Sequence, residues 1–169
     1  RDLGKLKEAE IYTRKAIELQ PDDAIAHSNL GTILRDLGNL QEAELSTRKA
    51  IELNPDFAIA YSNLGNILRD LGKSQEAFDS YLKSIEIKPD FAEAHYNPGI
   101  ILKNLGKLED AELSTRKAIE LNPDFADAYS NLGGMLKDLG NLQDAELSTR
   151  KAIELNPDFA KAHYNLGGI

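Results

Sequence analysis

Residues 43–58 read AELSTRKAIELNPDFA, and the same sixteen residues recur without change at 111–126 and 145–160. The starts of the three copies are separated by multiples of 34 residues. Glycine and proline keep the same step along the whole chain, at Gly4, Gly38, Gly72, Gly106 and Gly140 and at Pro21, Pro55, Pro89, Pro123 and Pro157. A constant period of this length predicts a stack of one small unit in place of a single closed core. Any binding function is then expected on a repeated surface.

One unit, from Ala24 to Phe57, contains two amphipathic patterns. In the first, apolar residues recur at intervals of three and four, as on one face of a helix, at Ala26, Leu30, Ile33, Leu34 and Leu37. Gly38 is expected to end this helix in a left-handed conformation. The second pattern has its apolar face at Leu40, Ala43, Thr47, Ala50, Ile51 and Leu53. Pro55 ends it, because proline cannot continue a helix, so the unit is predicted to be two antiparallel helices.

The aspartate after each proline is expected to cap the helix that follows. Asp56 and Asp90 are examples, since a carboxylate accepts hydrogen bonds from the first free N–H groups of a helix. Glu93 lies three residues after Asp90, as in a capping box. Small residues, such as Gly31 and Ala43, are expected where the two helices approach closely.

The chain is predicted to be a single array. It comprises a partial repeat at 1–23, full repeats at 24–57, 58–91, 92–125 and 126–159, and a partial repeat at 160–169. Because the chain opens at Arg1 inside a repeat, we expect it to be a piece of a longer protein. The unpaired helix at each end is expected to expose an apolar face that allows head-to-tail association of chains.

Composition narrows the class of protein. The 169 residues are 41% apolar and 28% charged, with no tryptophan or cysteine. Without cysteine, disulfides and thiolate metal sites are excluded, and we expect a cytoplasmic protein that uses no cofactor. The net charge of -8 argues against nucleic acid or an anionic membrane as partner, because both require a basic stripe, and it mildly favours a basic ligand. No apolar run approaches the length that spans a membrane.

The repeated positions resemble the tetratricopeptide repeat. The resemblance rests on leucine and glycine at positions 7 and 8 of the unit, alanine at 20 and mostly at 27, and proline at 32. It covers essentially the whole chain and implies an all-α, right-handed α-solenoid superhelix of antiparallel helix pairs, with a concave groove lined by the first helices. Two aromatic positions of the family differ here. Position 4 alternates between histidine and tyrosine, and position 24 is threonine except at Tyr81.

A polar stripe remains on each first helix, and position 6 within it is always asparagine: Asn29, Asn63, Asn97, Asn131 and Asn165. Asparagine forms helices less well than alanine by several tenths of a kcal/mol, so helix formation does not explain it. An amide both donates and accepts, and helices roughly 8 to 10 Å apart would present one amide about every third residue of an extended chain. We therefore predict a ladder for peptide backbone, with selectivity at varying positions such as Asn66. The alternative is that each asparagine bonds only to a neighbouring helix or to water.

A row of cations occupies position 12, at Arg35, Arg69, Lys103 and Lys137. It would suit an acidic ligand at the rim of the groove. The preferred interpretation is structural, because the helix dipole favours a cation in the last turn and an adjacent acid neutralises it. The carboxylate clamp of the family's chaperone-binding members needs lysine at position 5 of one repeat, and lysine and arginine at positions 2 and 6 of another. No repeat has lysine at position 5 or a basic residue at position 6, so chaperone tails are excluded as the ligand.

Three further features bear on function. His27, His95 and His163 are two units apart at a packing position, so they cannot converge on one metal ion. No catalytic constellation stands apart from the repeated scaffold, so catalysis is not expected. Pro98 replaces leucine inside a first helix and predicts a kink or opened turn between Ala94 and Asn97. That kink would either reshape the groove or be tolerated drift.

The main functional hypothesis is a non-enzymatic scaffold that holds an extended segment of a partner protein in its groove. One alternative is a self-assembling structural solenoid. Another is the substrate-recruiting arm of a larger glycosyltransferase. That alternative follows from resemblance to the O-linked N-acetylglucosamine transferases, whose repeats also read Ser-Asn-Leu, here at 28–30, 62–64 and 130–132.

Overall fold

The computed structural model describes residues 3–169, which form helices joined by short turns and contain no strand. The helices are α1 (Leu3–Leu19), α2 (Ala24–Asp36), α3 (Leu40–Leu53), α4 (Ala58–Asp70), α5 (Ser74–Ile87), α6 (Ala92–Asn104), α7 (Leu108–Leu121), α8 (Ala126–Asp138), α9 (Leu142–Leu155) and α10 (Ala160–Gly167). The predicted all-α fold of paired helices is confirmed.

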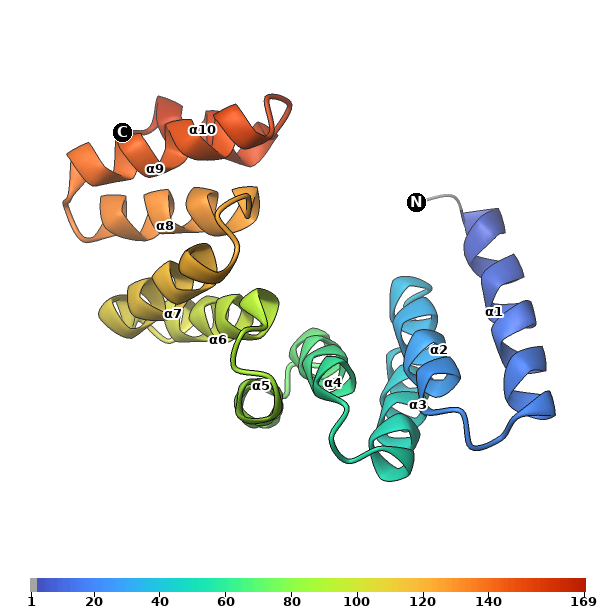
Figure 1. Ribbon diagram of the computed structural model, residues 1–169. Helices are drawn as coiled ribbons and strands as arrows, with labels where there is room; N and C mark the ends of the chain where they lie inside the picture. The colour runs from blue at the N-terminus through green and yellow to red at the C-terminus, as the bar shows by residue number, and fades with distance from the viewer. Residues whose placement is uncertain (1–2) are drawn as a thin grey trace. The chain divides into compact units, whose positions relative to one another are not determined.

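The chain divides into two compact units, Arg1–Pro89 with α1 to α5 and Asp90–Ile169 with α6 to α10. Within each unit the helices pack as successive pairs, such as α2 with α3 and α8 with α9 (Figure 1). The second helix of one pair then packs on the first helix of the next, as α3 does on α4 and α7 on α8. First helices of neighbouring repeats also touch, namely α2 with α4 and α8 with α10. First helices therefore line one surface within each unit.

Each first helix from α2 to α8 ends as the glycine spacing predicts. Gly38, Gly72, Gly106 and Gly140 have φ values of 83°, 78°, 74° and 81°, in the left-handed region that favours glycine. At the first of these turns the amide of Gly38 donates to the carbonyl of Arg35, and the amide of Asn39 donates to that of Leu34. These bonds satisfy carbonyl groups that the end of the helix would otherwise leave unpaired.

The predicted aspartate caps at Asp56 and Asp90 are wrong. The residues that precede α4 and α6 in the N-cap position are Phe57 and Phe91, neither of which makes a side-chain cap. The helices begin one residue later than the prediction requires, so the aspartate lies outside the cap position. Among the loops that precede α2 to α10, only the one before α2 carries an aspartate there, and Asp23 accepts from the amides of Ile25 and Ala26 at 2.9 and 3.1 Å.

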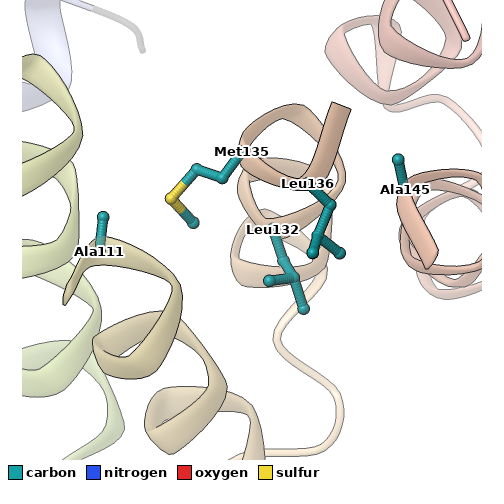
Figure 2. Close-up of a cluster of buried hydrophobic side chains, with 5 residues drawn as sticks. All are labelled: Ala111, Leu132, Met135, Leu136 and Ala145. Carbon is teal, nitrogen blue, oxygen red and sulfur yellow. The ribbon is translucent and has the colours of Figure 1, made fainter. Parts of the chain in front are cut away.

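The core of the second unit is built by α8. Figure 2 shows Leu132, Met135 and Leu136 of α8 between Ala111 of α7 and Ala145 of α9. Each of these side chains is at most 3% exposed. Alanine on the flanking helices lets them approach α8 closely, so the repeated small residues predicted from the sequence lie at helix contacts.

The glycine at position 8 lies under the side chain at position 24 of the same repeat. A Cβ atom added at Gly65 would stand 2.4 Å from the ring of Tyr81, and one at Gly31 would stand 2.0 Å from Oγ1 of Thr47. At Gly99 the corresponding distance to Oγ1 of Thr115 is 3.0 Å. The backbones approach equally closely in the two pairs, because the added Cβ would stand 3.2 Å from the carbonyl oxygen of Ala43 at Gly31 and 3.2 Å from that of Ala111 at Gly99, so only the contact with the threonine side chain differs.

Helix α6 continues from Ala92 to Asn104 with Pro98 inside it. The predicted opened turn between Ala94 and Asn97 does not interrupt the helix. Pro98 still has no N–H to donate to the carbonyl of Ala94, and both residues are buried. The neighbouring packing therefore holds a helix that lacks one of its hydrogen bonds.

Candidate functional site

Three of the five predicted asparagines donate a hydrogen bond to the first helix of the preceding repeat. In each case position 6 bonds to position 5 of that repeat, 35 residues earlier in the chain. We call these bonds the asparagine rungs. They join Nδ2 of Asn63 to Oγ of Ser28 at 3.2 Å, Nδ2 of Asn131 to the hydroxyl of Tyr96, and Nδ2 of Asn165 to the carbonyl oxygen and Oγ of Ser130 at 3.0 and 3.3 Å. The amide donors thus tie neighbouring first helices together.

The side-chain oxygens of the three rung asparagines differ in their partners. Within the described residues, no protein group donates to Oδ1 of Asn63 or Asn165, whereas Oδ1 of Asn131 accepts from Nζ of Lys161. Asn29 is exposed at the first of the five positions, and Asn97, beside Pro98, is only 8% exposed. The five asparagines are therefore not equivalent, although the sequence repeats them.

Asn66 lies above a buried tyrosine. Tyr81 of α5 is fully buried, and its hydroxyl donates to Oδ1 of Asn66 at 2.9 Å. Burial is the main reason why the pKa of Tyr81 is raised to about 12. The ring thus fills the space beneath α4, and its polar end reaches the surface of first helices at Asn66.

Two of the cations at position 12, Arg35 and Lys103, form ion pairs with an acid of the following repeat. Nε of Arg35 lies 2.6 Å from Asp70, and Arg69 lies 3.4 Å from the other oxygen of the same carboxylate. In the second unit Nζ of Lys103 lies 3.5 Å from Asp138. For Arg35 and Lys103 the neutralising acid is therefore in the next repeat. A structural role for these cations, neutralised by an acid, fits Arg35 and Arg69 better than Lys103, whose ion pair is the longest of the three.

The second unit has a hollow of about 270 Å³ on its first-helix side. Side chains from α6, α7, α8 and α10 surround it: Tyr96, Gly99, Ile100, Lys103, Asn104, Thr115, Asn131, Met135 and Lys161. We call this the α6–α8 hollow. Ile100 and Met135 give it apolar walls, and two lysines and the Asn131 rung give it polar ones. Tyr96 is fixed on one side by the ring of Phe125, whose centroid is 4.8 Å away.

Lys161 is the electrostatically unusual group of this hollow. The residue as a whole is exposed, but its ammonium lies against Asn131. Burial of that ammonium and repulsion from Lys103 lower the pKa of Lys161, and Asp127 opposes the shift. Two positive charges therefore face the same small space.

Sequence reasoning did not assign Tyr96 or Lys161 to the site. Both differ from the usual residue of the repeat. Tyr96 occupies position 5, where most repeats have serine, and Lys161 occupies position 2, where the other repeats have isoleucine or an acid. What the pattern lacked was the offset of 35 residues that brings position 6 of one repeat to position 5 of the one before. That offset depends on how one repeat packs on the next.

The histidines at position 4 bind the chain's own loops. Nε2 of His27 lies 2.9 Å from the carbonyl oxygen of Pro21, and Nε2 of His163 lies 2.8 Å from that of Pro157. Over residues 3–169, no three histidine or acidic side chains are grouped as metal ligands. At these two positions the ring contributes to the junction between the loop and the first helix.

Family models for the tetratricopeptide repeat match nearly the whole length. The matches fall at 1–23, 24–57, 47–79, 65–106, 92–125 and 126–159. The chain belongs to the tetratricopeptide repeat family. It is accordingly a helical repeat protein of the class that serves as protein-interaction scaffolds. No model of a catalytic family is among these matches.

Solved structures share this fold. A crystal structure of MamA is 26% identical with a TM-score of 0.76, and the match covers 94% of this chain and 92% of that one. A tetratricopeptide repeat protein of Thermus thermophilus is 22% identical with a TM-score of 0.81, covering 98% and 91%. PilF of Pseudomonas aeruginosa is 20% identical with a TM-score of 0.86, covering 96% and 74%. The last two show the α-solenoid fold alone.

No curated protein matches the chain. Among the described helices, none is both long enough and apolar enough to cross a bilayer. The resemblance to glycosyltransferase arms therefore remains a loose comparison that rests on the Ser-Asn-Leu motif.

Proposed function

We propose that the surface of first helices binds an extended segment of a partner protein through its main chain, with the position-6 asparagines as the principal contacts. The observation that carries this proposal is the available Oδ1 acceptor of Asn63 and Asn165 on the surface of first helices. Each is an amide whose orientation is already set by a rung, so less conformational entropy is lost on binding.

The rungs define what such a ligand must supply. Because Nδ2 is engaged with the preceding helix, the asparagine offers mainly an acceptor, and the peptide must donate its N–H groups. A peptide N–H bonded to an amide oxygen contributes about 0.5 to 1.5 kcal/mol net, so several contacts are needed for useful affinity. Repetition of the asparagine along the array is consistent with such additive binding.

The test is a triple substitution, Asn63→Ala, Asn131→Ala and Asn165→Ala, probed with an array of peptides of degenerate sequence, each about 12 residues long so that it spans several repeats. We expect binding to fall at least about tenfold, since the lost acceptors of Asn63 and Asn165 cost on the order of 1 kcal/mol each, and Asn131→Ala removes the third rung. The matched control is Glu52→Gln, Glu120→Gln and Glu154→Gln, three exposed residues of the second helices whose lysine pairs lie on the outer side. Unchanged binding by the asparagine variant with intact helicity would contradict the proposal.

A second probe separates main-chain from side-chain recognition. Peptides in which alternate backbone nitrogens are methylated retain their side chains but lose half of their donors. They are expected to bind as weakly as the parent peptides bind the triple variant. Equal binding of methylated and parent peptides would assign the affinity to side chains.

Self-association is a second candidate, favoured by the surface of α1. That helix has no buried residue, and Ala16 is exposed, whereas Ala50, Ala118 and Ala152 at the same position are 0% exposed. Ala16 thus belongs to a helix face that is buried against neighbouring helices in the other repeats. Ala16→Glu is expected to abolish any dimer seen by sedimentation velocity. Ile11→Glu, at a position that is exposed in other repeats as well, should leave the dimer intact.

A further inference from the structure

The α6–α8 hollow has the dimensions of a side-chain pocket. Its volume of about 270 Å³ lies below the range of roughly 300 to 1,000 Å³ that is usual for small-molecule sites. It opens on the surface where the peptide is proposed to lie, and Asn131, one of the rungs, is part of its wall. A peptide bound along that surface would therefore present a side chain to it.

The charges around the α6–α8 hollow determine which type of peptide side chain it suits. Lys103 comes from the last turn of α6 and Lys161 from the first turn of α10, and no acidic residue lines the hollow between them. Asp138 lies 3.5 Å from Lys103 but is not part of the lining, and Lys161 makes no ion pair within the described residues. The site thus has two cations and one long ion pair.

Gly134, at position 9 of its repeat, leaves room for this arrangement. A Cβ atom at Gly134 would stand 3.3 Å from Nζ of Lys103 and 3.8 Å from Nδ2 of Asn165. The repeats of the first unit carry Thr32 and Asn66 at position 9. Without a side chain at Gly134, the lysine of α6 lies against the surface of α8.

The first unit provides a contrast for the cations of position 12. There Arg35 and Arg69 share the carboxylate of Asp70 at 2.6 and 3.4 Å. There the carboxylate of Asp70 lies between the two arginines and pairs with both, and the space beneath α4 is filled by Tyr81. The second unit instead has Thr115 at the position of Tyr81, and its two lysines converge without an acid between them.

We propose that the α6–α8 hollow binds an aspartate or glutamate side chain of the partner segment, with the ammonium groups of Lys103 and Lys161 as its charge partners and Asn131 and Tyr96 as the polar wall. This assignment rests on the proposed function, because it supposes a peptide on the first-helix surface. It shares the position-2 lysine, Lys161, with the family's carboxylate clamp, but it differs in that tyrosine replaces the lysine at position 5 and Lys103, in the last turn of α6, supplies the second charge.

An incoming carboxylate relieves the repulsion between the two lysines and forms charge-assisted hydrogen bonds, which are stronger than neutral ones. A neutral amide of the same shape does neither. A lysine or arginine of the partner would add a third positive charge. The hollow is therefore specific for acidic residues, although the chain as a whole carries a net charge of -8.

The experiment uses the same peptide array, with every acidic peptide paired with a copy carrying Gln for Glu and Asn for Asp. The unsubstituted protein is expected to bind the acidic copy about tenfold more tightly. Lys103→Met and Lys161→Met should each reduce that preference to about threefold or less while leaving the affinity for the amide copies unchanged. Lys117→Met, an outer-face lysine paired with Glu120, is the charge-matched control and should keep the full preference.

The outcomes separate the two proposals. If no peptide binds, or if the triple asparagine variant binds as well as the parent, the proposed function fails. If peptides bind through the asparagines but acidic and amide copies bind equally, only the acidic-residue site is overturned. A phosphoserine copy that binds more tightly than the glutamate copy would also overturn the assignment to a carboxylate. Gly134→Asn, which crowds Lys103, is expected to weaken the preference without changing either lysine.

Discussion

The repeat with Tyr81 and the repeat with Thr115 differ in how far the side chain at position 24 fills the space beside the first helix. In the first unit the ring of Tyr81 lies against Gly65 and sends its hydroxyl to Asn66, so the space beneath α4 is filled. In the second unit Thr115 occupies the equivalent position beside Gly99 and forms part of an open hollow. Thr47 and Thr149 occupy the same position in other repeats, so the hollow depends on the side chains around Thr115 as well as on the small size of threonine.

The largest effect is expected from placing a side chain against the buried ring of Tyr81. Gly65→Ala places a methyl group against the rigid, fully buried ring of Tyr81 and should lower the free energy of unfolding by about 3 kcal/mol, measured by urea denaturation. Gly99→Ala meets Thr115 at 3.0 Å and should cost about 1 kcal/mol. Equal costs at the two sites would remove the proposed difference in packing. In a Tyr81→Ala background the cost of Gly65→Ala should fall below about 1 kcal/mol, because the ring that it meets is gone.

Restoring the regular helix in the second unit should have the next largest effect. Pro98→Leu returns an N–H to the buried carbonyl of Ala94 and matches the leucine of the other repeats. Since an interior proline costs about 3 kcal/mol, we expect the free energy of unfolding to rise by about 2 kcal/mol, with a higher melting temperature. Leu64→Pro, the reverse change in the first unit, should lower stability. If stability is unchanged or lower in Pro98→Leu, α6 is not strained by its proline.

The buried tyrosine predicts a stability loss at high pH. Its pKa is about 12 in the folded chain, against 10.0 for a tyrosine side chain exposed to water, so folding favours the protonated phenol. This contribution is complete below pH 10. It is lost as pH rises from about 10 to about 12, where the unfolded state releases a proton that the folded state keeps, at about 1.4 kcal/mol per pH unit.

Tyr81→Phe removes that titration. Its free energy of unfolding should decline less steeply above about pH 10 than that of the parent protein, as measured by urea denaturation at several pH values. Near neutral pH the same variant should cost about 1 kcal/mol, because the hydrogen bond to Asn66 is lost. Tyr61→Phe, at a partly exposed tyrosine of α4, is the control for the remaining tyrosines. Parallel pH profiles for Tyr81→Phe and the parent would contradict burial as the cause.

The smallest change concerns the charges of the hollow. Lys103→Met should raise the pKa of Lys161, because repulsion from Lys103 is one of the causes that lower it. Nuclear magnetic resonance of isotopically methylated lysines can follow the titration directly. Burial also lowers this pKa, so only part of the shift should be recovered. A pKa of Lys161 that does not move would mean that the two ammonium groups do not share the hollow.

Much of the fold follows from local pattern. The spacing of apolar residues and the glycine at the end of each first helix predict the helix pairs, and φ at Gly38 confirms the reason for that glycine. The N-caps could not be predicted to the residue, since Phe57 and Asp56 differ by one position and nothing in the pattern selects between them.

The candidate site was less predictable because it is made between repeats. The sequence shows that Asn63 and Asn131 recur, but not that their amides reach Ser28 and Tyr96, since this depends on the rotation from one repeat to the next. The same holds for Lys161, which lies 58 residues from Lys103 in the sequence and beside the same hollow in the fold.

The asparagine rungs also predict which partner sequences would bind this surface poorly. With each Nδ2 spent on the neighbouring helix, Asn63 and Asn165 present oxygen to an arriving chain. A proline has no N–H to give such an oxygen, and its ring would stand where the donor should be. Under the proposed binding mode, proline-rich segments, which are already extended and otherwise well suited to long grooves, are therefore expected to bind this surface least well.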